Sequence, residues 1–170
     1  NGFTYYIREN QTPKDKVSIK LIIKAGSIME EENQLGLAHL LEHMAFNGSK
    51  NFPKKTIDEY MSSIGLNLGS HYNASTGFLK TSYVYEIPTK NDKDVEVALK
   101  ILNDICKNLS LKPEAFERER KIVEEEWRRD IGGSKNYMNE FHKIIFKNSI
   151  FNERKPIGTL DIIQNFKYQD

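Results

Sequence analysis

Apolar and polar positions recur with two different periods along the chain, and the period predicts the elements. Short runs of apolar, β-branched and aromatic residues between turn-forming residues predict strands at 4–8, 17–25, 67–73 and 81–87. Longer stretches with apolar residues three and four positions apart predict helices at 35–46, 56–64, 92–109, 113–130 and 135–146. The Asn-Ala-Ser-Thr-Gly sequence at 73–77 is expected to form the turn between the third and fourth strands.

Strands that come early and helices that come later predict an α+β fold, with helices packed on one sheet. The 170 residues, 38% of them hydrophobic, are enough for one domain with one sizeable core. A periodic apolar segment at 157–166 has no expected sheet partner of its own. We therefore expect the chain to be part of a longer protein.

Composition excludes several classes of function. A net charge of +1, with basic and acidic residues interleaved, gives no general attraction to nucleic acid or to an acidic membrane surface. No run is long enough for a membrane span, and the N-terminus lacks a basic and apolar leader. The one cysteine, Cys106, allows no internal disulfide, is expected in the core, and leaves the compartment undecided.

The chemistry is concentrated in one short motif, His39-Leu-Leu-Glu42-His43. On a helix this spacing places both imidazoles on one face, one turn apart, where they can bind one metal ion. Glu42 lies beside that face and could accept a proton from a metal-bound water, as in zinc peptidases of the inverted His-x-x-Glu-His type. The alternative is a buried helix whose polar residues are satisfied without a metal.

A catalytic zinc site usually takes three protein ligands, so a third must come from elsewhere. In the acidic helix that follows, Glu119, Ile122, Val123 and Glu126 share one face, which its apolar members mark as inward. We expect Glu126 to be the third ligand and Glu119, two turns earlier, to be a buried acid that supports the site. The alternative is that these carboxylates form a solvated, salt-bridged face.

The chain resembles the pitrilysin or insulinase family of zinc metallopeptidases along nearly its whole length. The motifs that carry the resemblance are residues 36–48, 73–76, 119–127 and 156–158. The Glu-Glu-Trp-Arg sequence ending at Arg128 is similar to the bacterial, PqqL-like branch. The resemblance implies zinc bound by His39, His43 and Glu126, with Glu42 as the general base and Glu119 as a supporting catalytic residue. The stretch between His43 and Glu126 is a few residues longer than is common, so Glu119 is the reserve candidate for third ligand.

The resemblance also implies a mixed, largely antiparallel sheet with helices packed on it. Residues 1–170 would be the N-terminal zinc-binding catalytic domain, incomplete at its C-terminal end and completed by further homologous domains or a partner subunit. The implied function is that of a zinc-dependent endopeptidase, with one Zn2+ per chain, acting on extended peptides or small unfolded proteins. The expected location is the bacterial periplasm or outside the cell, with the cytoplasm as the alternative.

Three residues are expected to contact the peptide substrate. Asn73 and Ala74 resemble the strand edge that binds substrate backbone in this family, and Phe46 resembles a residue lining a substrate side-chain pocket. Their alternative roles are a turn former for Asn73 and a core residue for Phe46. A non-catalytic structural or peptide-binding subunit, and a zinc hydrolase acting on non-peptide amides, are the rival functions.

Overall fold

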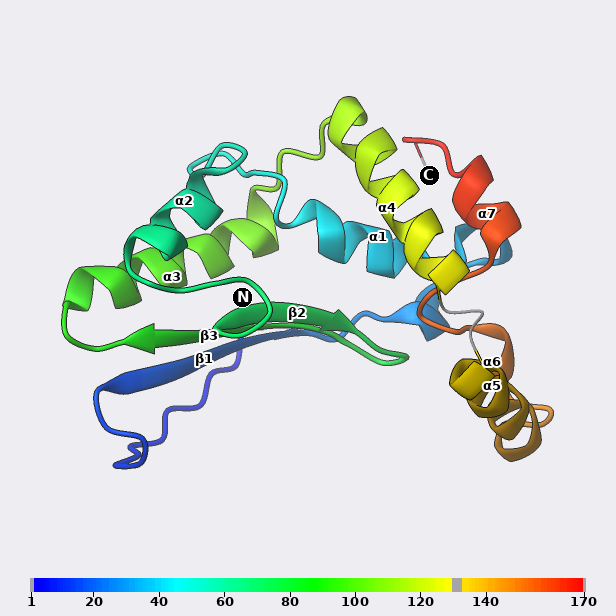
Figure 1. Ribbon diagram of the computed structural model, residues 1–170, viewed down its shortest axis with the longest axis horizontal. Coiled ribbons are helices and arrows are strands. Elements are labelled where there is room, and N and C mark those ends of the chain that lie inside the picture. Colours follow the sequence, from blue (N-terminus) through cyan, green and yellow to red (C-terminus); the bar gives the residue numbers. More distant parts are fainter. Residues whose placement is uncertain (1, 130–132, 170) are drawn as a thin grey trace.

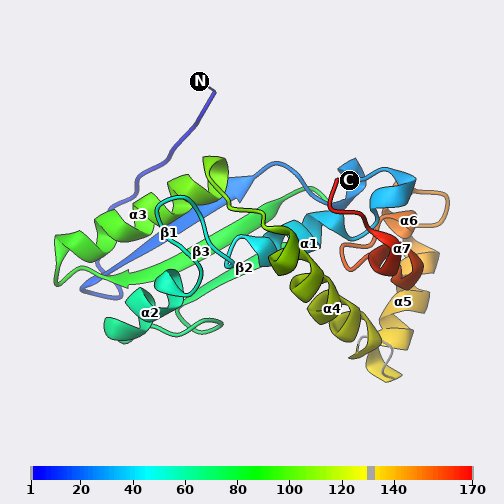
Figure 2. The same ribbon diagram turned by 90° about the horizontal axis from the view of Figure 1, so that it is seen from above.

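The fold is a small antiparallel sheet with helices on one face and a second group of helices beside it (Figures 1 and 2). This computed structural model describes residues 2–129 and 133–169. The strands are β1 (Lys16–Ile23), β2 (Tyr72–Thr76) and β3 (Thr81–Pro88), in the order β1-β3-β2. The helices are η1 (Ser27–Met29), η2 (Glu32–Gln34), α1 (Leu37–Met44), α2 (Thr56–Ser63), α3 (Asp92–Lys107), α4 (Pro113–Arg129), α5 (Gly133–Ile145), α6 (Ile150–Glu153) and α7 (Leu160–Asn165).

The main core lies between the sheet and the helices α2 and α3 (Figure 1). Tyr85 and Ile87 of β3 are fully buried against Met61 of α2 and Ile101 of α3. Burying each of the three apolar side chains, Ile87, Met61 and Ile101, contributes about 1.5–3 kcal/mol relative to leaving it in water. From Tyr83 onward, buried and half-buried positions alternate along β3, and this alternation fixes which face of the sheet the helices cover.

A second core joins α1, α4 and α7. Leu40 and Met44, one turn apart on α1, are buried against Phe116 and Val123 of α4. Ile163 of α7 completes this cluster and is fully buried. The apolar face of α1 thus packs against α4.

The start of α1 is held by a close backbone contact with Gly158 and by the carboxylate of Glu30. Gly36 precedes the helix at φ +99° and contacts Gly158, which has φ +74°. A Cβ on Gly158 would lie 2.3 Å from the carbonyl oxygen of Leu35 and 2.6 Å from the Cα of Gly36. The Glu30 carboxylate accepts hydrogen bonds from the backbone N–H groups of Gly36 (3.0 Å) and Ala38 (2.8 Å), which pairs otherwise free donors at the helix start.

The loop after α1 is held by a buried carboxylate of α3. Asp104 accepts hydrogen bonds from Ser49 Oγ (2.6 Å), from the backbone N–H of Asn51 (3.0 Å) and from the side-chain amides of Asn51 and Asn108 (2.8 Å each). Burial alone would raise the pKa of Asp104, but these hydrogen bonds outweigh it and lower the pKa to about 2. Both ends of α1 are therefore attached to parts of the chain that are distant in sequence.

Most predicted elements are confirmed. Each predicted helix forms, with ends within two residues of the predicted ones where the structure describes them; residues 130–132, including the end of the fourth predicted helix, lie outside the described part. The α+β class and the antiparallel pairing are also confirmed. No helix in the described part is both long enough and apolar enough to cross a membrane.

Two strand predictions are wrong. Residues 4–8 form no strand, and Tyr6 and Ile7 are 93% and 89% exposed, because no described strand lies beside them to pair with. The predicted strand at 67–73 begins only at Tyr72, since residues 67–71 are folded into a turn with Gly69 at φ +88°. Residues 73–76 therefore belong to β2, and the turn falls at 77–80.

Two side-chain predictions also fail. Cys106 is exposed rather than in the core, because it lies on the solvent side of α3. Ile122, expected to face inward with Val123, is 40% exposed, whereas Val123 is fully buried. The inward face of α4 is therefore centred on Val123.

Replacing Gly158 by alanine is expected to destabilise the protein more than the same change at Gly65. Gly65 has a similar φ of +80°, but a Cβ added there would have no atom within 4 Å, so Gly65→Ala should cost only the left-handed backbone penalty of about 1–2 kcal/mol. Gly158→Ala adds a backbone clash at the start of α1 and should cost about 1–3 kcal/mol more. Urea unfolding of the two variants measures the difference, and equal losses would contradict this role of Gly158.

Removing the charge of Asp104 is expected to change the pH dependence of stability. Because the folded-state pKa is lowered from 3.8 to about 2, the stabilisation is complete above about pH 4 and is lost as the pH falls toward 2. Asp104→Asn should lower the free energy of unfolding at pH 7 by about 2–4 kcal/mol. At pH 3 the difference in the free energy of unfolding between parent and variant, measured by urea titration, should be about 1 kcal/mol smaller than at pH 7.

Glu96→Gln, an exposed change on the same helix, is the control for Asp104 and should alter the unfolding free energy by less than about 0.5 kcal/mol. A gap between parent and Asp104→Asn that stays constant from pH 7 to pH 3 would contradict the assigned role of the carboxylate.

Candidate metal centre

Helix α1 brings its two histidines together. The Nε2 atoms of His39 and His43 are 3.3 Å apart, and the rings meet edge to face with centroids 4.7 Å apart. Both side chains are 17% exposed. They follow each other on one side of the helix, whereas Leu40 and Met44 pack into the second core.

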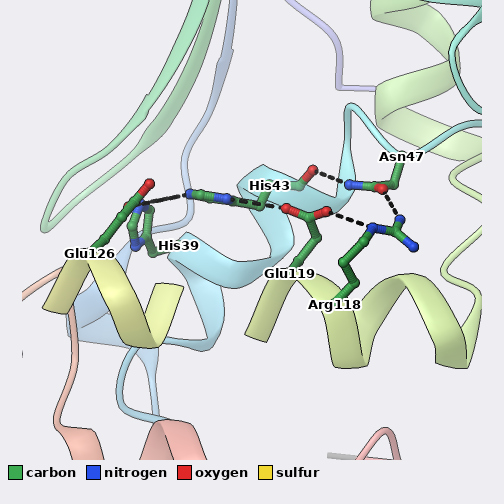
Figure 3. Close-up of polar contacts among 6 residues, drawn as sticks. All are labelled: His39, His43, Asn47, Arg118, Glu119 and Glu126. Carbon is green, nitrogen blue, oxygen red and sulfur yellow. Dashed lines mark hydrogen bonds and ion pairs between the residues drawn. The ribbon is translucent and has the colours of Figure 1, made fainter. Parts of the chain in front are cut away.

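Glu126 of α4 supplies a carboxylate oxygen to the same place (Figure 3). Its Oε2 atom is 3.7 Å from His39 Nε2 and 3.6 Å from His43 Nε2. In a tetrahedral zinc site with bonds of about 2.0–2.1 Å, neighbouring ligand atoms lie about 3.3–3.4 Å apart. The spacing of these three donors and their two-histidine, one-carboxylate chemistry therefore fit a zinc ion with an open fourth position.

Glu119 lies on the other side of His43. Its Oε2 atom is 3.5 Å from His43 Nδ1, the nitrogen that faces away from His39 (Figure 3). Burial would raise the pKa of Glu119, but hydrogen bonds from His43 and Asn47 and the nearby charges lower it. Glu119 thus lies outside the three-donor group and contacts one of its members.

The two histidines are in different electrostatic surroundings. Burial, with the nearby charge of His43, lowers the pKa of His39 to about 4. Burial alone would lower the pKa of His43 too, but Glu119, Glu126 and Glu42 raise it. His39 Nδ1 is buried without a hydrogen-bond partner among the described residues, whereas His43 Nδ1 faces Glu119.

Glu42 points toward β2 rather than α4. Its Oε2 atom accepts a hydrogen bond from Thr76 Oγ1 at 2.6 Å, and the residue is only 8% exposed. Burial raises the pKa of the Glu42 carboxyl, and the hydrogen bond from Thr76 offsets this only in part. A carboxylate with a raised pKa is suited to accept and return a proton.

A pocket of about 290 Å³ opens beside this carboxylate. The residues that line it are His39, Glu42, Ala74, Ser75, Thr76, Pro156 and Ile157. The pocket therefore connects a candidate metal donor and the candidate base with the end of β2.

Of the three residues expected to contact substrate, only Ala74 lines this pocket. Asn73 is exposed on the other face of β2. Beyond β3, no described strand pairs with β2, and after Tyr72, which is bridged by Leu68, the second edge of β2 is open. Phe46 does not line the pocket; it is half-buried beside Tyr72 and Tyr83, where ring centroids are 6.4 and 6.3 Å away.

Sequence reasoning missed Thr76 as a partner of Glu42. The period of a strand could have identified it, because residues two apart lie on one face and Thr76 is two positions after Ala74. It also missed Asn47 and Arg118. Arg118 donates a hydrogen bond to Asn47, which in turn donates one to the backbone carbonyl of His43. Nothing in the spacing along the chain indicates that pair.

Comparisons with known proteins identify the family of the chain. The family described as Insulinase (Peptidase family M16) matches residues 5–156. The chain is 37% identical to the probable zinc protease PqqL of Haemophilus influenzae over 164 residues, which is 96% of this chain and 18% of the relative. It is 31% identical to a PQQL-like zinc protease of Arabidopsis thaliana, covering 97% of this chain and 17% of that protein.

Solved structures of peptidases are similar to the fold of this chain. The crystal structure of the periplasmic protease PqqL from Escherichia coli matches 92% of this chain with a TM-score of 0.88 and 30% identity, and 17% of that structure is covered. Pitrilysin matches 87% of the chain with a TM-score of 0.69 and 26% identity, over 15% of its own length. The chain thus spans less than a fifth of these relatives. It belongs to the insulinase family of peptidases, family M16.

Proposed function

We propose that this chain is the zinc-binding catalytic part of a metalloendopeptidase. His39, His43 and Glu126 would hold one zinc ion per chain, and the three donor atoms within 4.8 Å of one another are the observation that carries the proposal. The naming of its relatives as zinc proteases supports the choice of metal. Zinc bound there would polarise the scissile carbonyl and lower the pKa of a water molecule.

Glu42 is the proposed general base. The Thr76 hydroxyl holds one of its oxygens, and the carboxylate would accept a proton from water and deliver it to the leaving amine. Its position on the wall of the pocket places it beside any peptide that enters there. Glu119 supports the site by accepting the hydrogen of His43 Nδ1, so that Nε2 of the same ring keeps its lone pair for the metal.

The open edge of β2 is the proposed binding site for substrate backbone. An extended peptide could add as a further strand along Asn73 and Ala74, through main-chain hydrogen bonds that depend little on sequence. The proposed substrates are therefore extended peptides or small unfolded proteins. Phe46 is half-buried beside Tyr72 and Tyr83 and lies outside the pocket, so its proposed contact with a substrate side chain would be made elsewhere along the peptide.

The remainder of the protein is proposed to complete the substrate site. Because the chain spans 17–18% of its PqqL-type relatives, residues 1–170 would form the zinc-binding domain, with further domains or a partner subunit closing over the peptide. The periplasmic description of the Escherichia coli relative supports a periplasmic location for this protein as well.

Two substitutions in the complete protein separate metal binding from catalysis. Glu42→Gln should keep about one zinc per chain and lose peptide cleavage by about 100-fold or more, because the base is removed and the ligands remain. Glu126→Gln should lose most of the zinc as well as the activity. Elemental mass spectrometry and cleavage of an unfolded protein substrate measure the two effects.

Glu125→Gln is the matched control, since Glu125 is exposed on the same helix and contacts Arg128 instead of the histidines. It should retain both zinc and activity. Cleavage that persists in Glu42→Gln would contradict the proposed base, and full zinc content in Glu126→Gln would move the third ligand elsewhere. A parent protein that binds zinc but cleaves no peptide would favour the non-catalytic function.

A further inference from the structure

A closed ring of polar contacts joins α1 and α4 around His43 (Figure 3). Asn47, four residues after His43, donates from Nδ2 to the His43 carbonyl oxygen at 3.1 Å. Asn47 Oδ1 accepts a hydrogen bond from Arg118 Nη2, and Arg118 Nε is 3.5 Å from Glu119 Oε1. The other oxygen of Glu119 faces His43 Nδ1 at 3.5 Å, which closes the ring.

We propose that Asn47 and Arg118 are positioning residues of the metal centre. They form a clamp that fixes the Glu119 carboxylate against His43 Nδ1 and thereby holds His43 Nε2 toward the metal. This inference rests on the proposed function, because it concerns the zinc site formed by His39, His43 and Glu126.

The geometry of arginine explains why this residue type suits the task. The guanidinium is planar with donors in a fixed fork, so one arm can bind Asn47 while Nε faces Glu119. Neighbouring residues on a helix point in different directions, and the contact with Asn47 keeps the guanidinium on the side where Glu119 lies. Since Asn47 is also bound to the His43 backbone, the fork is fixed relative to the helix that carries both histidines.

The positive charge of Arg118 offsets the negative charge that surrounds His43. Glu42, Glu119 and Glu126 all lie within the electrostatic surroundings of His43. An unrestrained Glu119 could rotate and compete as a metal donor, or leave His43 Nδ1 without an acceptor. By contacting the second carboxylate oxygen, Arg118 restricts Glu119 to one orientation and balances one negative charge.

The burial pattern makes the clamp testable. The side chain of Glu119 is 10% exposed and that of His43 17%, whereas that of Arg118 is 40% exposed. Removing the guanidinium therefore opens space to solvent instead of leaving a void in the core. We expect Arg118→Met, which keeps much of the side-chain stem, to fold with little change in stability.

The experiment is zinc competition with a chromophoric chelator, in the complete protein. Arg118→Met should weaken zinc affinity about tenfold, the lower end of the effect typical for residues that orient metal ligands. Cobalt substitution gives an independent readout, because its visible absorption depends on the geometry of the ligands, and the band should shift in Arg118→Met. Asn47→Ala breaks the same ring from the loop after α1 and should change zinc affinity and the cobalt spectrum in the same direction. It provides the test if Arg118→Met fails to fold.

Arg120→Met is the matched control, since Arg120 lies on the same helix but contacts Glu117 and Gln164. It should match the parent in zinc affinity and in the cobalt spectrum. If the parent binds zinc and both ring variants bind it equally tightly with unchanged spectra, the clamp is overturned and the proposed function stands. If the parent binds no zinc at all, the proposed function fails and the clamp fails with it.

Discussion

The packing of α1 against α4 is the contact on which the rest of the site depends. Its apolar part, Leu40 and Met44 against Phe116 and Val123, excludes water and sets the separation of the two helices. Its polar part lies along the edge of the same contact and brings Glu126 to both histidines. A shift of one helix along the other by one turn, a rise of about 5.4 Å, would separate the three donors.

Several distant segments prevent such a shift. The close approach of Gly36 and Gly158 fixes the start of α1, and Asp104 fixes the loop that follows it. The hydrogen bond between Thr76 and Glu42 attaches α1 to the sheet on the side opposite to α4. The candidate metal centre is therefore positioned by three neighbours that are independent of one another, as a site whose ligands must be held at short, fixed distances requires.

The helices, and the proximity of the three candidate donors, could be predicted because their signals are local. His39 and His43 are one helical turn apart, and Ile122 and Val123 together indicated the face of α4 that carries Glu126, although only Val123 is buried. Residues 4–8 were predicted wrongly because a strand depends on a partner, which composition does not reveal. The pairing of Thr76 with Glu42 and of Arg118 with Asn47 spans 34 and 71 residues. The strand period places Thr76 on the same face as Ala74, but which residue of α1 it meets, and that Arg118 meets Asn47, follows from the tertiary arrangement.

The central claim is that α1 and α4 together form a three-ligand zinc site. The most direct test is a crystal structure of the zinc-loaded protein, with anomalous diffraction recorded on both sides of the zinc absorption edge. We predict one anomalous peak within bonding distance of His39 Nε2, His43 Nε2 and a carboxylate oxygen of Glu126, with Glu119 at His43 Nδ1. A peak bound by Glu119 in place of Glu126, or no peak between the two histidines, would contradict the account.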